Sequence, residues 1–464
     1  MKNLKLLLCL LLAILLSVPV FGLEYEDGEE IESEAEPMVL SYSQAVQMAL
    51  EDVLSIQDLS DQISDMQDQR NDLRRDIRTL EQGGVLEGMV PNHEVSEQLD
   101  RVIMQIATMH MQMEQLQDNQ AMSMEQLLSG LQPDGDAMNA AGAVQSIIGN
   151  TLAMQDMMNA LSMLEMQRLT LQSQVTPIQD GNQRSELIRE LRNGVTELEH
   201  QIEISTITHA QMRLLRELSL RNLIVAVTDA TISLESTQAS LALTEENFRR
   251  TAVQYEFGLI SRNALRTVEQ NITRINNELT DRQTDLYNAH QSLNHFLGQP
   301  LSQETIIEFE HALPEIPEDL NEHIAEILPL FPNIIRFQHD VDRTGAARRA
   351  YRGSNRETRN TLQAAYDRAQ LELNQAKMDL ETSIRRSFNN LETQLRRKEN
   401  LYRALELAVE SVILERSNML SGRATQFDID TALLAVFNAE LDIQRAYNAL
   451  WVQAFIFDNP ILFS

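Results

Sequence analysis

The stretch YEFGLISRNALRTVEQNITRINNELTDRQTDLYNAHQSLNHFLGQP at residues 255–300 decides the fold, and MLSGRATQFDIDTALLAVFNAELDIQRAYNALWVQAFI at residues 419–456 repeats its pattern. In each stretch a glycine follows a long helical pattern and precedes a shorter one. Glycine tolerates the left-handed backbone that ends a helix. The two glycines lie 164 positions apart, and neighbouring positions share this displacement: Phe248 and Val412, Tyr255 and Met419, Gly258 and Gly422, Ile260 and Ala424, Leu265 and Ile429. The sequence therefore predicts a duplicated antiparallel helical hairpin with a glycine at each tip.

The helix before the first tip carries two apolar lines with a seven-residue period, which is typical of coiled coils. One line consists of Leu220, Val227, Leu234, Leu241, Phe248 and Tyr255, and the other of Leu218, Val225, Ile232, Ala239 and Val253, with Glu246 as its charged member. The lines are about 140° apart around the helix. Two stripes predict a neighbour on each side, as in a wall of helices. Burial of the helix in a bundle is the alternative.

Breaks in the pattern divide the chain into segments, and their helical character predicts an all-α fold of elongated coiled-coil hairpins. The expected segments are a signal peptide (1–22), an acidic disordered leader (23–40), an opening helix (41–88), a Met/Gln-rich helical insert (89–184), a long hairpin with its tip at 258 (185–300), a Pro-containing linker (301–332) and the second-half helices with their tip at 422 (333–464). The openings of the two halves also correspond, at a displacement of 278 or 279 residues.

The composition favours long helices and excludes some functions. Glycine (16) and proline (11) are scarce in the 464 residues, and aromatic residues make up 5%. The formal net charge of −31 makes nucleic-acid binding unfavourable, because it repels phosphates.

The N-terminus predicts export. Lys2 and Lys5 precede an apolar run that is too short to span a bilayer, and small residues up to Gly22 follow it. The single cysteine, Cys9, lies within this signal, so the exported chain is expected to have no disulfide. We expect a location in the cell envelope.

The tip stretches, together with LSYSQAVQMAL at residues 40–50, resemble the TolC-type outer-membrane efflux duct family. The resemblance covers residues 40–80 and 185–460. It implies a homotrimer whose hairpins close into a hollow α-helical barrel, and a periplasmic adaptor and inner-membrane pump that engage the tips. The positions that match the family tips are Phe257, Gly258, Leu259, Ile260 and Ser261 in the first half, and Ser421, Gly422, Arg423, Ala424, Thr425 and Asp428 in the second. The first tip has Ala264 at the position where the second tip has Asp428. Ordinary capped turns without a binding role are the alternative.

The sequence departs from the family in the middle of each half, where members that span an outer membrane contribute β-barrel strands. Residues 351–362, YRGSNRETRNTL, are short, charged and without alternation, so they predict only a turn. The corresponding place in the first half holds the Met/Gln-rich insert, whose pattern is helical. We therefore expect the β-barrel strands to be absent and membrane association to be indirect, through another component or in an envelope without an outer membrane.

Other motifs are weak candidates for metal sites. Met109-His110-Met111-Gln112-Met113 resembles copper(I)-binding strings, but a helix would place only Met109 and Met113 on one face. Glu197-x-x-His200 and Glu308-x-x-His311 match the spacing of di-iron bundles, but the second lies in the Pro-containing linker. We expect no metal, no cofactor and no enzymatic activity.

The sequence thus predicts a passive helical conduit or stalk of an envelope efflux or secretion system, which docks to its partners through the tips. An exported coiled-coil structural or adhesive spacer is the alternative.

Overall fold

The structure is a computed structural model that describes residues 38–51, 54–82, parts of 101–168, 181–310, 316–317 and 319–463. The expected signal peptide and most of the expected acidic leader lie outside the described residues. So do His110 and His311 of the two candidate metal motifs.

The two halves of the chain contain the same series of elements, namely a strand, a short helix, a longer helix, a very long helix and a returning helix. The first half has β1 (Met38–Ser41), α2 (Tyr42–Glu51), α3 (Leu54–Glu81), α6 (Gly181–Glu256) and α7 (Arg262–Phe296). The second half has β2 (Thr305–Glu308), α8 (Leu320–Ile327), α9 (Pro332–Ala350), α10 (Arg356–Leu420) and α11 (Gln426–Asp458), with short 3₁₀ turns at η1 (Leu328–Leu330) and η2 (Pro460–Phe463). The predicted all-α fold of duplicated antiparallel hairpins is confirmed, and both tip turns keep the displacement of 164 residues.

The join between α9 and α10 is short. Only residues 351–355 separate the two helices, and Asn355 caps α10 by accepting a hydrogen bond from the backbone N–H of Glu357. Most of the stretch 351–362 that we expected to be a turn therefore already belongs to α10.

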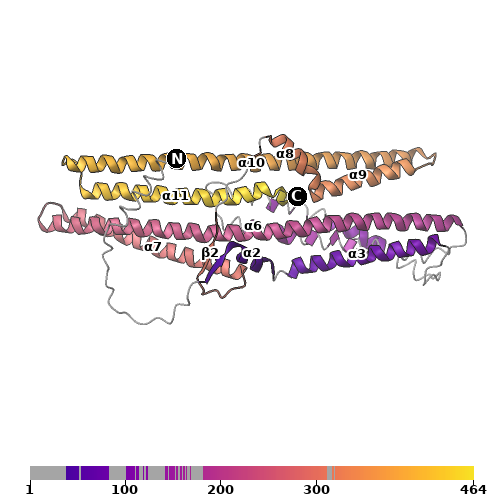
Figure 1. The fold of residues 1–464 in the computed structure, drawn as a ribbon, viewed down its shortest axis with the longest axis horizontal. Coiled ribbons are helices and arrows are strands. Elements are labelled where there is room, and N and C mark those ends of the chain that lie inside the picture. The colour runs from indigo at the N-terminus through magenta and orange to yellow at the C-terminus, as the bar shows by residue number, and fades with distance from the viewer. Residues whose placement is uncertain are drawn as a thin grey trace. The chain divides into compact units, whose positions relative to one another are not determined.

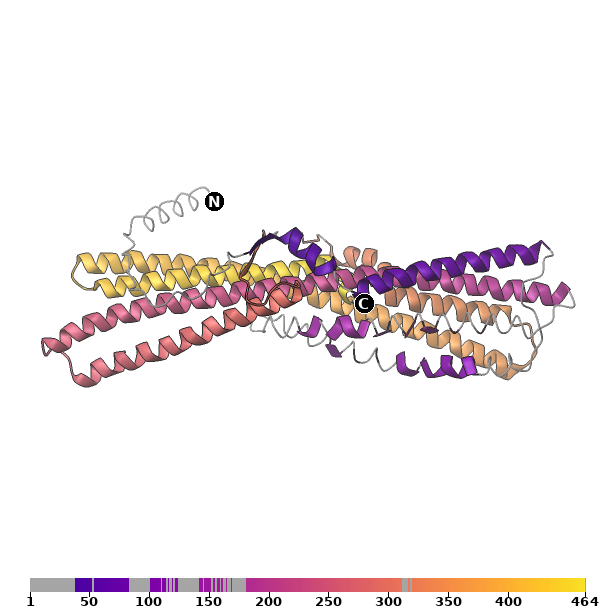
Figure 2. The ribbon, with the colours of Figure 1, turned by 90° about the horizontal axis from the view of Figure 1, so that it is seen from below.

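Helix α6 is the longest element and has neighbours from both halves of the chain. Its 76 residues span about 114 Å at 1.5 Å per residue. Towards the tips α6 packs on α7 and α11, and towards its N-terminus it packs on α3 and α9 (Figure 1). The second view shows the same neighbours (Figure 2). The two apolar lines of this helix are therefore matched by neighbours on two sides.

The helices form a row rather than a closed bundle. At the tip end the order is α7, α6, α11 and α10, and at the other end it is α3, α6, α9 and α10 (Figure 2). Within the described residues the long helices that pack along α10 are α9 and α11, both from its own half. Helix α10 thus lacks the second pair of neighbours that its equivalent α6 has.

A small sheet, which we did not predict from the sequence, joins the two halves. Strands β1 and β2 pair in parallel, with Val39 opposite Ile306 and Leu40 opposite Ile307. Four residues are too few to show an alternating pattern, and the pairing joins segments that are remote in sequence. Parts of the expected leader and linker are therefore ordered as strands.

The sheet lies beside the largest apolar core cluster, which includes residues of α2, α6, α7 and α11. Trp451 contacts Tyr42 with ring centroids 5.4 Å apart and Phe309 at 4.6 Å. The guanidinium of Arg221 lies over the Trp451 ring at 4.4 Å and pairs with Glu217 at 3.1 Å. Burial is the main cause that raises the pKa of Tyr42, whose hydroxyl donates to Glu217. This cluster fixes α2 against α11.

The contact between α6 and α11 contains a series of polar side chains. Asn448 donates to Asp229 at 2.9 Å, Arg445 donates to the Ser233 hydroxyl at 2.9 Å, and the Ser236 hydroxyl donates to Asn438 at 2.7 Å. Burial raises the pKa of Asp229, although the hydrogen bond from Asn448 and the charge of Arg445 lower it. The two hairpins are thus joined by hydrogen bonds that must all be satisfied together.

Replacement of Asp229 by Asn should stabilise the chain at pH 7.5 and have little effect at low pH. Because the folded-state pKa of Asp229 is raised, the wild-type chain loses stability as the pH rises through that pKa, and a neutral amide avoids this loss. Urea unfolding at the two pH values, followed by circular dichroism, measures the difference. Asn448→Ala is the control, because it leaves Asp229 without its donor and should destabilise the chain by roughly 1–3 kcal/mol. Equal stability of Asp229→Asn and wild type at both pH values would contradict the expectation.

Candidate docking site at the two helix tips

The two tips have the same backbone geometry. Gly258 and Gly422 both have a φ of 69°, in the left-handed region. At the first tip the N–H of Gly258 donates to the carbonyl of Tyr255 and that of Leu259 to Gln254, both at 2.9 Å. Gly422 and Arg423 make the equivalent bonds to Met419 and Asn418, at 3.0 and 2.8 Å. Each tip is thus a glycine-dependent helix end of the Schellman type.

The helices that follow the glycines are capped differently. Ser261 accepts a hydrogen bond from the N–H of Ala264 at 3.3 Å. At the second tip the Asp428 carboxylate accepts from the backbone N–H of Thr425 at 2.7 Å and from the Thr425 hydroxyl at 2.8 Å. These bonds, the backbone one first, lower the pKa of Asp428. The acid that distinguishes the second tip therefore acts within its own turn, as part of a capping box.

Large apolar side chains are exposed at both tips. Phe257 is 76% exposed, Leu259 is 74% exposed and Leu420 is 89% exposed. Leu420, the last residue of α10, was not among the residues we selected from the sequence. Ile260 and Ala424, which we selected, are half-buried, whereas Arg423 is exposed. Exposed apolar patches of this kind are characteristic of interaction surfaces.

An ion pair joins the two hairpins just behind the tips. Arg250 of α6 contacts Asp430 of α11 at 3.4 Å and Glu246 at 2.9 Å. Arg250 precedes Gly258 by eight residues, and Asp430 follows Gly422 by eight residues. The two tips therefore lie at the same level along the helices.

The comparisons with known proteins give structural similarity alone. No protein-family model matches the sequence, and no curated protein matches it. Similar solved structures include the outer membrane protein VceC from Vibrio cholerae, with 14% identity, 59% of this chain and 75% of that chain covered, and a TM-score of 0.42. The chain is also similar to CusC, with 14% identity, 58% of this chain and 73% of that chain covered, and a TM-score of 0.45. For the Campylobacter jejuni CmeC outer membrane channel the identity is 11%, the coverage is 59% of this chain and 67% of that chain, and the TM-score is 0.44. The function proposed below rests on the contacts of this chain.

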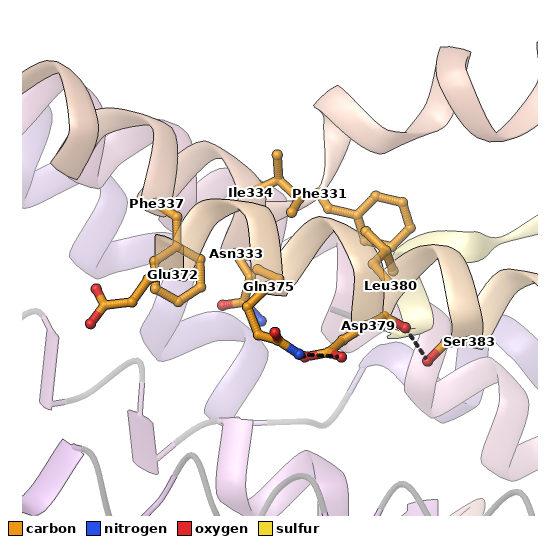
Figure 3. A pocket seen from close by; sticks show the side chains of 10 residues that line it. Phe331, Asn333, Ile334, Phe337, Glu372, Gln375, Asp379, Leu380 and Ser383 are labelled. Atoms are coloured by element: carbon orange, nitrogen blue, oxygen red, sulfur yellow. Dashed lines mark hydrogen bonds between the residues drawn. The ribbon is translucent and has the colours of Figure 1, made fainter. Parts of the chain in front are cut away.

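A pocket of about 360 Å³ lies between the start of α9 and α10, away from the tips (Figure 3). Phe331, Ile334 and Leu380 form its apolar wall. Its polar side chains are engaged with neighbours, because Gln375 donates to Asp379 at 3.0 Å and Glu372 pairs with Arg368 at 2.7 Å. The sequence did not indicate this pocket. It is a depression beside the core cluster of α8, α9 and α10, and its lining suggests no particular ligand.

The candidate metal motifs do not converge in the described residues. Met109 and Met113 are half-buried and Met111 is 63% exposed, as the helical spacing requires. Glu197 and His200 lie on α6, where His200 stacks on His339 of α9. Within the part of the chain that the structure describes, no group of three or more His, Cys, Asp or Glu side chains is arranged to hold a metal ion.

None of the described helices combines the length and the apolar character needed to cross a membrane.

Gly422→Ala should loosen the second tip because of backbone conformation alone. A Cβ at Gly422 would meet nothing within 4 Å, so the cost is that of a left-handed residue with a side chain, roughly 1–2 kcal/mol. Gly422→Asn should cost less, because Asn adopts this conformation more readily. Hydrogen exchange of residues 417–429 should be fastest in Gly422→Ala, slower in Gly422→Asn and slowest in the wild type.

Gly149→Ala is the matched control for this series. It lies in a helix, has equally open surroundings, and should leave exchange at the tip unchanged. Identical tip exchange in the wild type and both Gly422 variants would show that the left-handed turn is not needed there.

Proposed function

We propose that the chain is a TolC-like component of an envelope efflux or secretion system, a passive helical conduit built from three copies. The observation that carries this proposal is the difference between the equivalent helices α6 and α10. Helix α6 has neighbours from both halves, whereas α10 packs along helices of its own half only. A second copy can supply the missing neighbours.

Internal duplication specifies which surfaces would meet. Within one copy, Arg250 of α6 contacts Asp430 of α11. The equivalent positions, 164 residues away, are Leu414 on α10 and Arg266 on α7. Both are exposed, Leu414 to 58%. Helix α7 of one copy would therefore lie along α10 of the next, and a contact that joins two different surfaces can close into a ring.

The tips would dock this ring to an adaptor or pump. Phe257, Leu259 and Leu420 supply apolar contacts at one end of the row, and Arg423 makes no ion pair within the described residues. Transport energy would come from the partner. The exported coiled-coil spacer is the alternative, and it would need neither a ring nor a lumen.

Disulfide crosslinking tests the arrangement of copies. In a Cys9→Ser chain, Leu414→Cys combined with Arg266→Cys should form covalent oligomers up to a trimer on oxidation, because the two residues would come from different copies. Each single variant should form none. Crosslinking by Leu414→Cys alone would indicate a symmetric dimer, and a monomer in sedimentation would favour the spacer; either result would contradict the proposal.

Docking through the tips can be tested separately. Phe257→Ser combined with Leu420→Ser should abolish co-purification with adaptor or pump components from the producing cells, while the trimer remains intact. Leu371→Ser is the matched control, since Leu371 is 68% exposed on α10 but distant from the tips. Co-purification that survives the double replacement would exclude the tips as the docking surface.

A further inference from the structure

A pair of stacked histidines lies between α6 and α9. The rings of His200 and His339 are stacked with centroids 3.8 Å apart and planes inclined by 16°. His200 is 8% exposed, and its Nε2 has no hydrogen-bond partner among the described residues. His339 Nε2 lies 3.6 Å from the Glu197 carboxylate. This is an unusual contact at the centre of an interface between two long helices.

Among the described residues, no apolar core cluster combines buried residues of α6 with buried residues of α9. The cluster of α3 and α6 includes Leu187, Leu191 and Leu198, and the cluster of α8, α9 and α10 includes Ile334 and Val341. No residue belongs to both clusters. Away from the tips, α6 and α9 are also the two long helices through which the halves of the chain touch. The histidine pair therefore contributes a large part of the side-chain packing between α6 and α9.

The charges around the pair make protonation unfavourable on balance. On α9, Arg336 disfavours a charge on His200, whereas Asp340 favours it. Arg336 itself is near Asp340 and near Glu372 of α10. On α6, Glu197 faces His339, and Glu199 next to His200 pairs with Arg74 of α3. Asp340 and Glu199 thus already have positive partners, whereas Glu197, within the described residues, faces His339 alone. Two protonated rings in face-to-face contact would repel each other.

We propose that the stacked pair of His200 and His339 is an acid-sensitive joint that lets the two halves separate at the end of the helices away from the tips. Burial, with a smaller effect of His339, lowers the pKa of His200 to about 4. A histidine that leaves the stack regains an ordinary pKa near 6.5 and takes up a proton. The closed contact is therefore favoured above pH 6.5 and loses stability as the pH falls towards 4.

The seam at the tip end should respond differently. Within the described residues, the side-chain bonds given above between α6 and α11 involve Asp229, Ser233, Ser236 and Arg250 of α6 and no histidine. Protonation of Asp229, whose pKa is raised by burial, removes a buried charge and does not weaken this seam by repulsion. Mild acid should thus open one end of the chain and leave the other closed.

Distances between spin labels, measured by double electron–electron resonance in a full chain with Cys9→Ser, test whether the α6–α9 contact opens. Spin labels at Glu203→Cys on α6 and Asp342→Cys on α9 should give one narrow distance at pH 7.5 and an additional longer distance at pH 5. The matched pair across the other seam, Glu245→Cys and Thr431→Cys, should give the same distance at both pH values. Circular dichroism at pH 5 confirms that the helices persist.

Variants distinguish the histidines from a general effect of acid. His200→Phe with His339→Phe keeps two stacked rings without titration and should retain the narrow distance at pH 5. His200→Phe alone provides the same test if the double variant does not fold, because it removes the buried histidine that takes up the proton. His295→Phe, at an exposed histidine of α7, should open as the wild type does. The proposal is overturned by an unchanged α6–α9 distance in the wild type at pH 5, by opening of both contacts together, or by opening in the variants that replace His200 with phenylalanine.

Discussion

The structure depends on covering the apolar face of a 76-residue helix along most of its length. Such a helix cannot bury its stripes within itself, and most helical stability in proteins comes from packing of the apolar face. In this chain the longer helices that pack on α6 are α7 and α3 from its own half and α11 and α9 from the other, in addition to the short helix α2. The remaining architecture follows, because those neighbours can reach α6 only if the second half lies alongside it.

Two kinds of contact share this task. Within each half the helices pack through leucine, isoleucine and valine, as in the cluster of Val412, Ala432 and Val436 between α10 and α11. Between the halves, the apolar cluster that contains Trp451 is accompanied by hydrogen bonds of the α6–α11 contact and by the histidine stack of the α6–α9 contact. Apolar packing tolerates changes of pH and ionic strength, whereas polar contacts respond to them. The chain therefore combines rigid hairpins with seams whose strength depends on the solution.

The sequence was most informative where the chain is most regular. The glycines at 258 and 422, the seven-residue lines of α6 and the displacement of 164 residues predicted the long helices and their tips, because each signal extends over many residues. The pairing of β1 with β2 could not be predicted, since strands of four residues carry no periodicity. The exposure of Leu420 and the stacking of His200 on His339 were also hidden, because both depend on which helices become neighbours. Asp428 was identified as a tip residue, but its engagement with Thr425 became evident only from the geometry of the turn.

The parallel pairing of β1 with β2 also has a consequence for the order of folding. Met38 pairs with Thr305, so the first strand of the chain has no partner until 267 further residues have been added. The helices α6 and α7 lie between these strands in the sequence and can form from local contacts, which are gained quickly. Closure of the small sheet is a long-range event that can follow formation of the first hairpin. The edge of β1 is consequently open to other strands during synthesis, in the interval when a growing chain is most vulnerable to mispairing.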